Sequence, residues 1–140
     1  AGGIGLFVDA IDEQAAVYYQ DSVARSHTIA PDALTRSPKP LALKTVDEEL
    51  ELKDGAMTMN LYHLTGVTHA DTLLVAYFPR ERVLVEVDVY TPGAAPAPWA
   101  ASLLENIKRR NLRVDRIVPL HGMSGPFGDL VKTAQAAPPK

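Results

Sequence analysis

The chain has 140 residues, a formal net charge of −3 at pH 7 and no cysteine. This length fits one domain with its own core, and the acidic balance argues against a nucleic-acid partner, which usually needs a basic surface. No apolar run approaches the roughly 20 residues that span a bilayer. We therefore expect a soluble protein, cytoplasmic or periplasmic, without a membrane partner. The lack of cysteine excludes disulfides and thiolate ligands, so any metal must be held by His and carboxylates.

The N-terminal third of the sequence predicts helix and loop. Residues 12–25 are expected to form a helix, because Asp12 can cap its N-terminus and apolar residues such as Ala16 and Tyr19 recur at helical spacing. Residues 27–40 contain three prolines and several polar side chains, which indicates a loop or a short helix over 31–35.

From Leu41 onward the apolar period changes to that of strands. Residues 41–46, 50–53 and 57–64 each alternate apolar and polar side chains. Asp54-Gly55 between the second and third segments predicts a hairpin turn, since glycine adopts positive φ without a Cβ penalty.

A second hairpin is predicted for residues 72–78 and 82–89, joined around P-R-E-R at 79–82. Both segments are almost continuously apolar, which is typical of strands buried on both faces of a sheet.

The C-terminal third predicts a helix over 98–110, a short buried strand over 116–120 and a closing helix over 127–136, followed by a tail that should fray. The basic residues at 108–110 suit the negative end of a helix dipole. In the helix predicted over 98–110, the side chains expected to face the core are Trp99, Leu103, Leu104 and Ile107.

These elements predict an α/β fold. Residues 41–64, 72–89 and 116–120 would build a mixed or antiparallel sheet with helices on one face. There is no internal repeat and no convincing domain boundary, so we expect a single domain over residues 1–140.

Three apolar segments carry candidate metal ligands at or near their ends. These segments are G-V-T-H-A-D at 66–71, V-L-V-E-V-D-V-Y at 83–90 and I-V-P-L-H-G at 117–122, with His69, Asp88 and His121 as the candidates. Neighbouring strands of one sheet deliver their terminal residues to a common rim, and imidazole with carboxylate suits a borderline ion such as zinc.

The order and spacing of these segments resemble the second half of the metallo-β-lactamase superfamily, most closely between Tyr62 and Val89. The resemblance implies part of an αββα sandwich in which His69 binds a first zinc ion, Asp88 bridges two ions and His121 binds the second. Nothing in the chain matches the His-x-His-x-Asp-His signature of the family. The opening Ala1-Gly2-Gly3 is similar to the run that follows this signature, so we expect a truncated domain that begins just after it.

Each candidate also has a plainer interpretation. His69 alone could be a turn histidine bonded to backbone, and His121 could belong to an ordinary loop. Asp88 should either meet a cation or cap backbone amides, because an unpaired buried charge is costly. Glu86 could assist the site, although pairing with Lys or Arg is the simpler expectation.

Three further polar residues are not carried over as ligands, and of these His63 and His27 match no ligand position of the family. His63 is most simply a packed strand residue, Asp71 a turn residue, and His27 has no counterpart.

Two functions follow from the resemblance. In the first, the chain derives from a zinc-dependent hydrolase that cleaves an unknown small-molecule ester, amide or lactone once its metal site is completed. In the second, it is a catalytically silent half-domain that serves as an oligomeric binding or structural module. A sheet face left uncovered by the absent half should pair with a second copy, so we expect a homo-oligomer, most simply a dimer.

Overall fold

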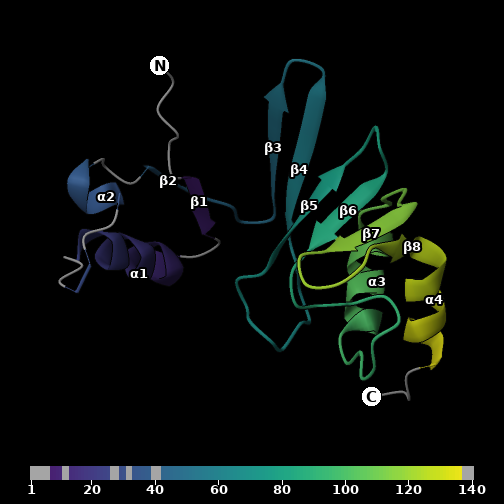
Figure 1. Cartoon of the computed structure of the whole chain (residues 1–140). Coiled ribbons are helices and arrows are strands. Elements are labelled where there is room, and N and C mark those ends of the chain that lie inside the picture. The colour runs from purple at the N-terminus through teal and green to yellow at the C-terminus, as the bar shows by residue number, and fades with distance from the viewer. Residues whose placement is uncertain (1–6, 11–12, 26–28, 31–32, 39–41, 137–140) are drawn as a thin grey trace. The chain divides into compact units, whose positions relative to one another are not determined.

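The computed structural model describes residues 7–10, 13–25, 29–30, 33–38 and 42–136 (Figure 1). The chain divides into two compact units, Ala1–Asp47 and Glu48–Lys140. The single domain expected over the whole chain stays a prediction.

The first unit contains a short parallel strand pair and two helices. Strand β1 (Phe7–Ala10) pairs with β2 (Ala42–Thr45). Helix α1 (Glu13–Ala24) confirms the predicted helix, and α2 (Ala33–Arg36) is a single helical turn within the segment predicted as loop or short helix. The proposed cap Asp12, His27 and the frayed tail after Ala136 lie outside the described residues.

The second unit is built on a six-stranded mixed sheet with the order β3-β4-β5-β6-β7-β8. Strands β3 to β6 form an antiparallel meander, β6 and β7 are parallel, and β8 returns antiparallel to β7. Gly55, at φ +56°, makes the predicted β3–β4 turn. The strands are β3 (Glu49–Asp54), β4 (Met57–His63), β5 (Leu74–Phe78), β6 (Val83–Glu86), β7 (Arg116–Pro119) and β8 (Gly125–Pro126).

Two helices cover one face of this sheet, as predicted. Helix α3 (Ala100–Arg109) is the crossover between the parallel strands β6 and β7, and α4 (Phe127–Ala136) follows β8 and packs beside α3 (Figure 1). The core between sheet and helices includes Tyr62, Val75, Tyr77, Leu84 and Ile117 from the strands and Leu103, Leu104, Ile107 and Leu130 from the helices.

The opposite sheet face corrects the prediction that the second hairpin is buried on both sides. Along β5 and β6 buried residues alternate with half-buried ones, because α3 and α4 cover only the face that carries Val75 and Leu84. The half-buried residues of the other face are Leu74, Ala76 and Phe78 on β5 and Val83 and Val85 on β6. We call these five residues the open sheet face.

A buried polar cluster ties α3 to the end of β4. The Asn106 side chain is 4% exposed, and its Nδ2 donates hydrogen bonds to the carbonyl oxygens of Thr65 and Ser102, both at 2.8 Å. Its Oδ1 accepts from the Thr65 amide at 3.2 Å, from Arg109 at 3.1 Å and from Arg110 at 3.0 Å. Every polar atom of this side chain is therefore hydrogen-bonded, and we call the cluster the Asn106 junction.

Arg110 extends the junction to β4. Its Nη2 donates to the His63 carbonyl oxygen at 2.6 Å, and its guanidinium lies 5.2 Å from the centroid of the Tyr62 ring. Burial lowers the pKa of Arg110, and the nearby charge of Arg109 lowers it further. Lys108 and Arg109 in the last turn confirm the basic end of α3, and Arg110 at the C-cap connects that end to the sheet.

Within the described residues, no helix combines the length and apolar character needed to cross a bilayer.

Candidate metal-binding site

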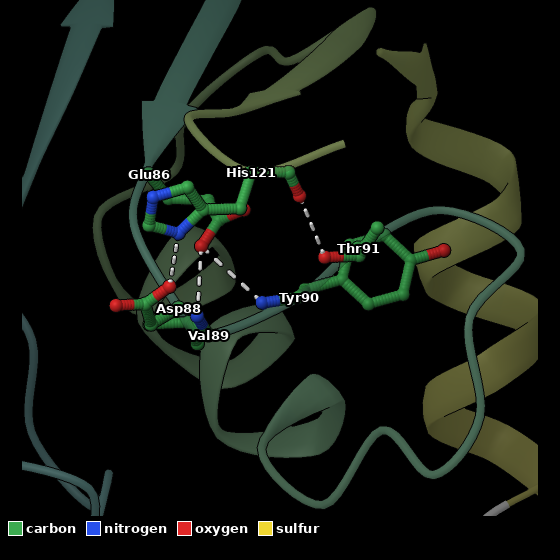
Figure 2. Close-up of polar contacts among 6 residues, drawn as sticks. All are labelled: Glu86, Asp88, Val89, Tyr90, Thr91 and His121. Atoms are coloured by element: carbon green, nitrogen blue, oxygen red, sulfur yellow. Dashed lines mark hydrogen bonds and ion pairs between the residues drawn. The ribbon is translucent and has the colours of Figure 1, made fainter. Parts of the chain in front are cut away.

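The structure brings Asp88 and His121 into direct contact. Strands β6 and β7 are parallel neighbours that end at Glu86 and Pro119, so their C-terminal ends reach the same edge of the sheet. Two residues beyond each end, His121 Nδ1 lies 2.6 Å from Asp88 Oδ1 (Figure 2). Two of the three predicted ligands therefore share one rim, and we call this contact the rim pair. Metal coordination by these residues stays a prediction.

Asp88 lies in a turn rather than in the strand predicted for it. Strand β6 stops at Glu86, and the Asp88 backbone has φ +59°, a conformation that is uncommon for residues other than glycine. Such left-handed residues are tolerated where surrounding contacts hold them, and they concentrate at functional sites.

Glu86 supplies contacts of this kind. It is 2% exposed, and its Oε2 accepts hydrogen bonds from the backbone amides of Val89 at 2.9 Å and Tyr90 at 3.2 Å (Figure 2). Its Oε1 has no hydrogen-bond partner among the described residues. Burial raises the pKa of the Glu86 carboxyl, and the two amide hydrogen bonds oppose that rise. The expectation that Glu86 pairs with Lys or Arg is wrong, because it caps backbone amides instead.

The His121 side of the rim pair is held by close backbone packing. The Thr91 hydroxyl donates to the His121 carbonyl oxygen at 3.1 Å. Next to it, Gly122 has φ +123°, and a Cβ at this position would lie 2.6 Å from Thr91 Cγ2. Only glycine fits this approach without displacing the loop.

His69 lies beside Trp99. The two rings are 5.0 Å apart between centroids and tilted by 45°, and the Trp99 indole donates to the Thr68 hydroxyl at 3.1 Å. In the part of the chain that the structure describes, no group of three or more His, Asp or Glu side chains is placed to hold a metal ion. The structure therefore joins Asp88 with His121 and leaves His69 at Trp99.

His63 and Asp71 make a contact that needs no ligand. His63 Nε2 lies 2.7 Å from the Asp71 carbonyl oxygen, which ties the end of β4 to the following loop. This agrees with their interpretation as a packed strand residue and a turn residue.

The rim pair suits a metal in the type of its donors but not in their number. Because Nδ1 faces the Asp88 carboxylate, Nε2 is the ring nitrogen of His121 that is left for a metal ion, and carboxylates orient metal-binding histidines in this way. The side chains are 43% exposed at Asp88 and 74% at His121, so a ligand can reach them. A catalytic zinc usually takes three protein ligands and a water, so one or more ligands must come from elsewhere.

Sequence reasoning missed two residues at this site, Glu86 as a turn cap and Trp99 as the neighbour of His69. The sequence did contain a signal for Glu86. It is a carboxylate at the end of an apolar strand, and the turn amides that it accepts from follow three and four residues later. Nothing in the sequence pairs Trp99 with His69, because the two residues meet only through the packing of α3.

Neither protein-family models nor curated protein sequences give a match to this chain. Solved structures do. The chain is similar to rubredoxin oxygen:oxidoreductase from Desulfovibrio gigas, with a TM-score of 0.57, 16% identity and coverage of 92% of this chain and 35% of that one. It is also similar to a metallo-β-lactamase from Hirschia baltica, with a TM-score of 0.51, 15% identity and coverage of 76% of this chain and 53% of that one. For the flavodiiron protein from Giardia intestinalis the TM-score is 0.52 and the identity 13%, with coverage of 74% of this chain and 31% of that one.

These similarities define the fold. The chain has the metallo-β-lactamase fold in part, and it spans between 31% and 53% of the length of these three proteins. The predicted resemblance is confirmed for the fold. At 13–16% identity the similarities do not extend to an activity.

Proposed function

We propose that the rim pair is part of a zinc site and that the chain contributes to zinc-dependent hydrolysis of a small-molecule ester, amide or lactone when further ligands complete that site. The observation that carries this proposal is the 2.6 Å contact between Asp88 and His121 at one edge of a metallo-β-lactamase-like sheet. Two independent segments of the sequence, 33 residues apart, deliver ligand-type side chains to the same point.

Each residue has a defined task in this proposal. Bound zinc would supply a water whose pKa is lowered to about 7, and hence a nucleophile at neutral pH. His121 would offer Nε2 as a ligand. Asp88 would fix the tautomer of His121 through Oδ1 and keep Oδ2 available for the ion. His69 would have to leave the Trp99 ring to join them.

The direct test is zinc content. The 140-residue chain, its N-terminus verified, is purified with zinc and its zinc content is measured by elemental analysis. The measurement is made on the chain alone and on the chain fused to, or co-expressed with, a segment that carries His-x-His-x-Asp-His. We expect zinc retention and ester or lactone hydrolysis in the completed protein, and loss of both in Asp88→Ala. Asp115→Ala is the matched control, because Asp115 is an exposed carboxylate whose single ion pair within the described residues is with Arg82, at 3.6 Å. Equal zinc content in the completed protein and its Asp88→Ala variant would contradict the proposal.

Trp99 allows a separate test of His69. It is the only tryptophan in the chain, so its fluorescence reports on the ring beside it. If His69 moves to zinc, titration of the completed protein with zinc should change Trp99 emission, and His69→Ala should abolish that change. A wild-type protein that binds zinc with unchanged emission would remove His69 from the ligand set.

The alternative is a catalytically silent module that assembles with itself. It is supported by the open sheet face and by the lack of any group of three candidate ligands among the described residues. We propose that two copies pack this face against itself about a two-fold axis, since apolar sheet surfaces are stabilised by burial. Light scattering at micromolar concentration should show a dimer, and Val85→Lys should yield monomers. A stable wild-type monomer would contradict this alternative.

A further inference from the structure

We propose that Glu86 is the positioning residue of the rim pair, setting the turn that presents the Asp88 carboxylate to His121. This inference concerns the geometry of the site, and only its zinc readout rests on the proposed function. It assigns a role to a buried carboxylate that coordinates no ion in the proposal and whose hydrogen bonds within the described structure go to two backbone amides.

The side chain of Glu86 acts on the Asp88 side. Its Oε2 binds the amides of Val89 and Tyr90, the two residues that directly follow Asp88. Those two amides are buried along with their acceptor, and a buried amide without an acceptor is costly. The two hydrogen bonds therefore offset the unfavourable left-handed backbone of Asp88 and fix the direction of its side chain.

The backbone of Glu86 acts on the His121 side. Its carbonyl oxygen accepts a hydrogen bond from the Leu120 amide at 3.0 Å, one residue before His121. Glu86 thus bonds to the residue that precedes His121 and to the residues that follow Asp88. Figure 2 shows the two hydrogen bonds of its carboxylate to the backbone of Val89 and Tyr90. A displacement of Glu86 would move both partners.

Only one carboxylate oxygen performs this task. Oε2 accepts both amide bonds, whereas Oε1 has no partner among the described residues. Glutamine keeps an acceptor oxygen at the same distance from the backbone and should replace glutamate. Aspartate keeps the charge but is one methylene shorter and should not reach both amides. Methionine keeps the length and apolar volume but offers only a weak acceptor.

The experiment measures the tautomer of His121 in the full chain by nitrogen-15 NMR. The signal is assigned among the four histidines with His121→Gln. In the wild type and in Glu86→Gln we expect the Nδ1–H tautomer that donates to Asp88. In Glu86→Met and Glu86→Asp the ratio should shift toward Nε2–H by about tenfold, the loss expected when one hydrogen bond to a charged group is broken. Asp88→Ala shows how far the tautomer ratio shifts when the hydrogen bond between His121 and Asp88 is lost completely.

The matched control is Tyr90→Phe, because the Tyr90 hydroxyl is buried and has no hydrogen-bond partner among the described residues. This change alters the same turn without removing a hydrogen bond, and it should leave the tautomer ratio unchanged. A purely structural Glu86 would lower thermal stability in the Met and Asp variants and leave the ratio at its wild-type value in whichever of them folds. That result overturns the inference, as does a shift in Glu86→Gln equal to that in Glu86→Asp.

Zinc binding separates this inference from the proposed function. In the completed protein, Glu86→Met or Glu86→Asp should weaken zinc binding, and Glu86→Gln should rescue it. A wild-type completed protein that binds no zinc would sink the proposed function, whereas the tautomer series in the chain alone would still decide the role of Glu86.

Discussion

The Asn106 junction and the rim pair are both polar clusters of the Glu48–Lys140 unit, yet they are built in opposite ways. At the junction a buried amide has a partner for every polar atom, and it accepts bonds from two arginines. At the rim pair an exposed carboxylate with a left-handed backbone meets an exposed imidazole, and a buried carboxylate behind them keeps one unpartnered oxygen within the described structure. Saturated networks hold elements together, whereas exposed groups held by strained backbone remain available to a ligand.

The largest effect should come from the junction. Asn106→Leu removes an acceptor and two donors from a site that is 4% exposed and leaves the Thr65 amide and carbonyl without their partner. We expect the free energy of unfolding to fall by about 3 kcal/mol or more, measured by urea denaturation. Glu105→Ala, an exposed neighbour on α3, should change it by no more than about 0.5 kcal/mol. A small loss in Asn106→Leu would show that the junction is not structural.

The next effect tests how tightly the rim is packed. Gly122→Ala places a Cβ 2.6 Å from Thr91 Cγ2 at φ +123°, and it should cost about 2 kcal/mol and weaken the Asp88–His121 contact. Adding Thr91→Ser removes the clashing methyl and keeps the hydroxyl, so it should recover part of this loss. Gly128→Ala is the control, since nothing lies within 4 Å of the added Cβ. If the double variant recovered nothing, strain in the backbone of Gly122 alone would account for the loss.

A smaller effect on stability is expected at Tyr77, which, like Asn106 at the junction, is buried and hydrogen-bonded. Tyr77 is 5% exposed and donates to the Arg113 carbonyl oxygen at 2.8 Å. At pH 8, Tyr77→Phe should lower stability by about 1 kcal/mol through the lost hydrogen bond.

The same variant gives a pH dependence with a defined sign. Burial raises the pKa of Tyr77 above its usual value of 10.0, so the unfolded chain ionises first and the folded chain retains the proton. The stability that Tyr77 contributes is therefore fully present below pH 10 and is lost as pH rises through the folded-state pKa. Urea titrations between about pH 8 and pH 11 should show the difference between wild type and Tyr77→Phe shrinking. A constant difference would mean that Tyr77 titrates alike in both states.

Much of the fold could be predicted because the spacing of apolar residues along the chain indicates which segments form strands and which form helices. The β3–β4 hairpin, the helix that became α3 and the closing helix α4 appear where alternation, Gly55 and helical spacing indicate. Burial of the second hairpin was wrong on one face, because an apolar run does not reveal whether a layer of structure lies on each side.

The candidate site was predictable in its residues but not in its geometry. The ends of two apolar segments pointed to Asp88 and His121, since parallel neighbours deliver their ends to one edge. The end of β6 at Glu86 and the left-handed turn at Asp88 accompany local hydrogen bonds from the Val89 and Tyr90 amides to the Glu86 carboxylate, which the continuous apolar pattern of this segment concealed. The position of His69 depends instead on a distant residue, Trp99, which lies 30 residues further along the chain and is brought to it by α3.

The sequence by itself determined most of the element types, the superfamily resemblance and the chemical identity of the candidate ligands, because these depend on residue type and short-range spacing, whereas strands β1 and β8 were not predicted. The tertiary structure alone decided that Asp88 and His121 touch while His69 rests on Trp99, and that helices α3 and α4 cover one face of the sheet while the other face carries half-buried residues. The physical reason is that each of these facts depends on contacts between segments far apart in the chain, whose energies outweigh local preferences once the core has formed.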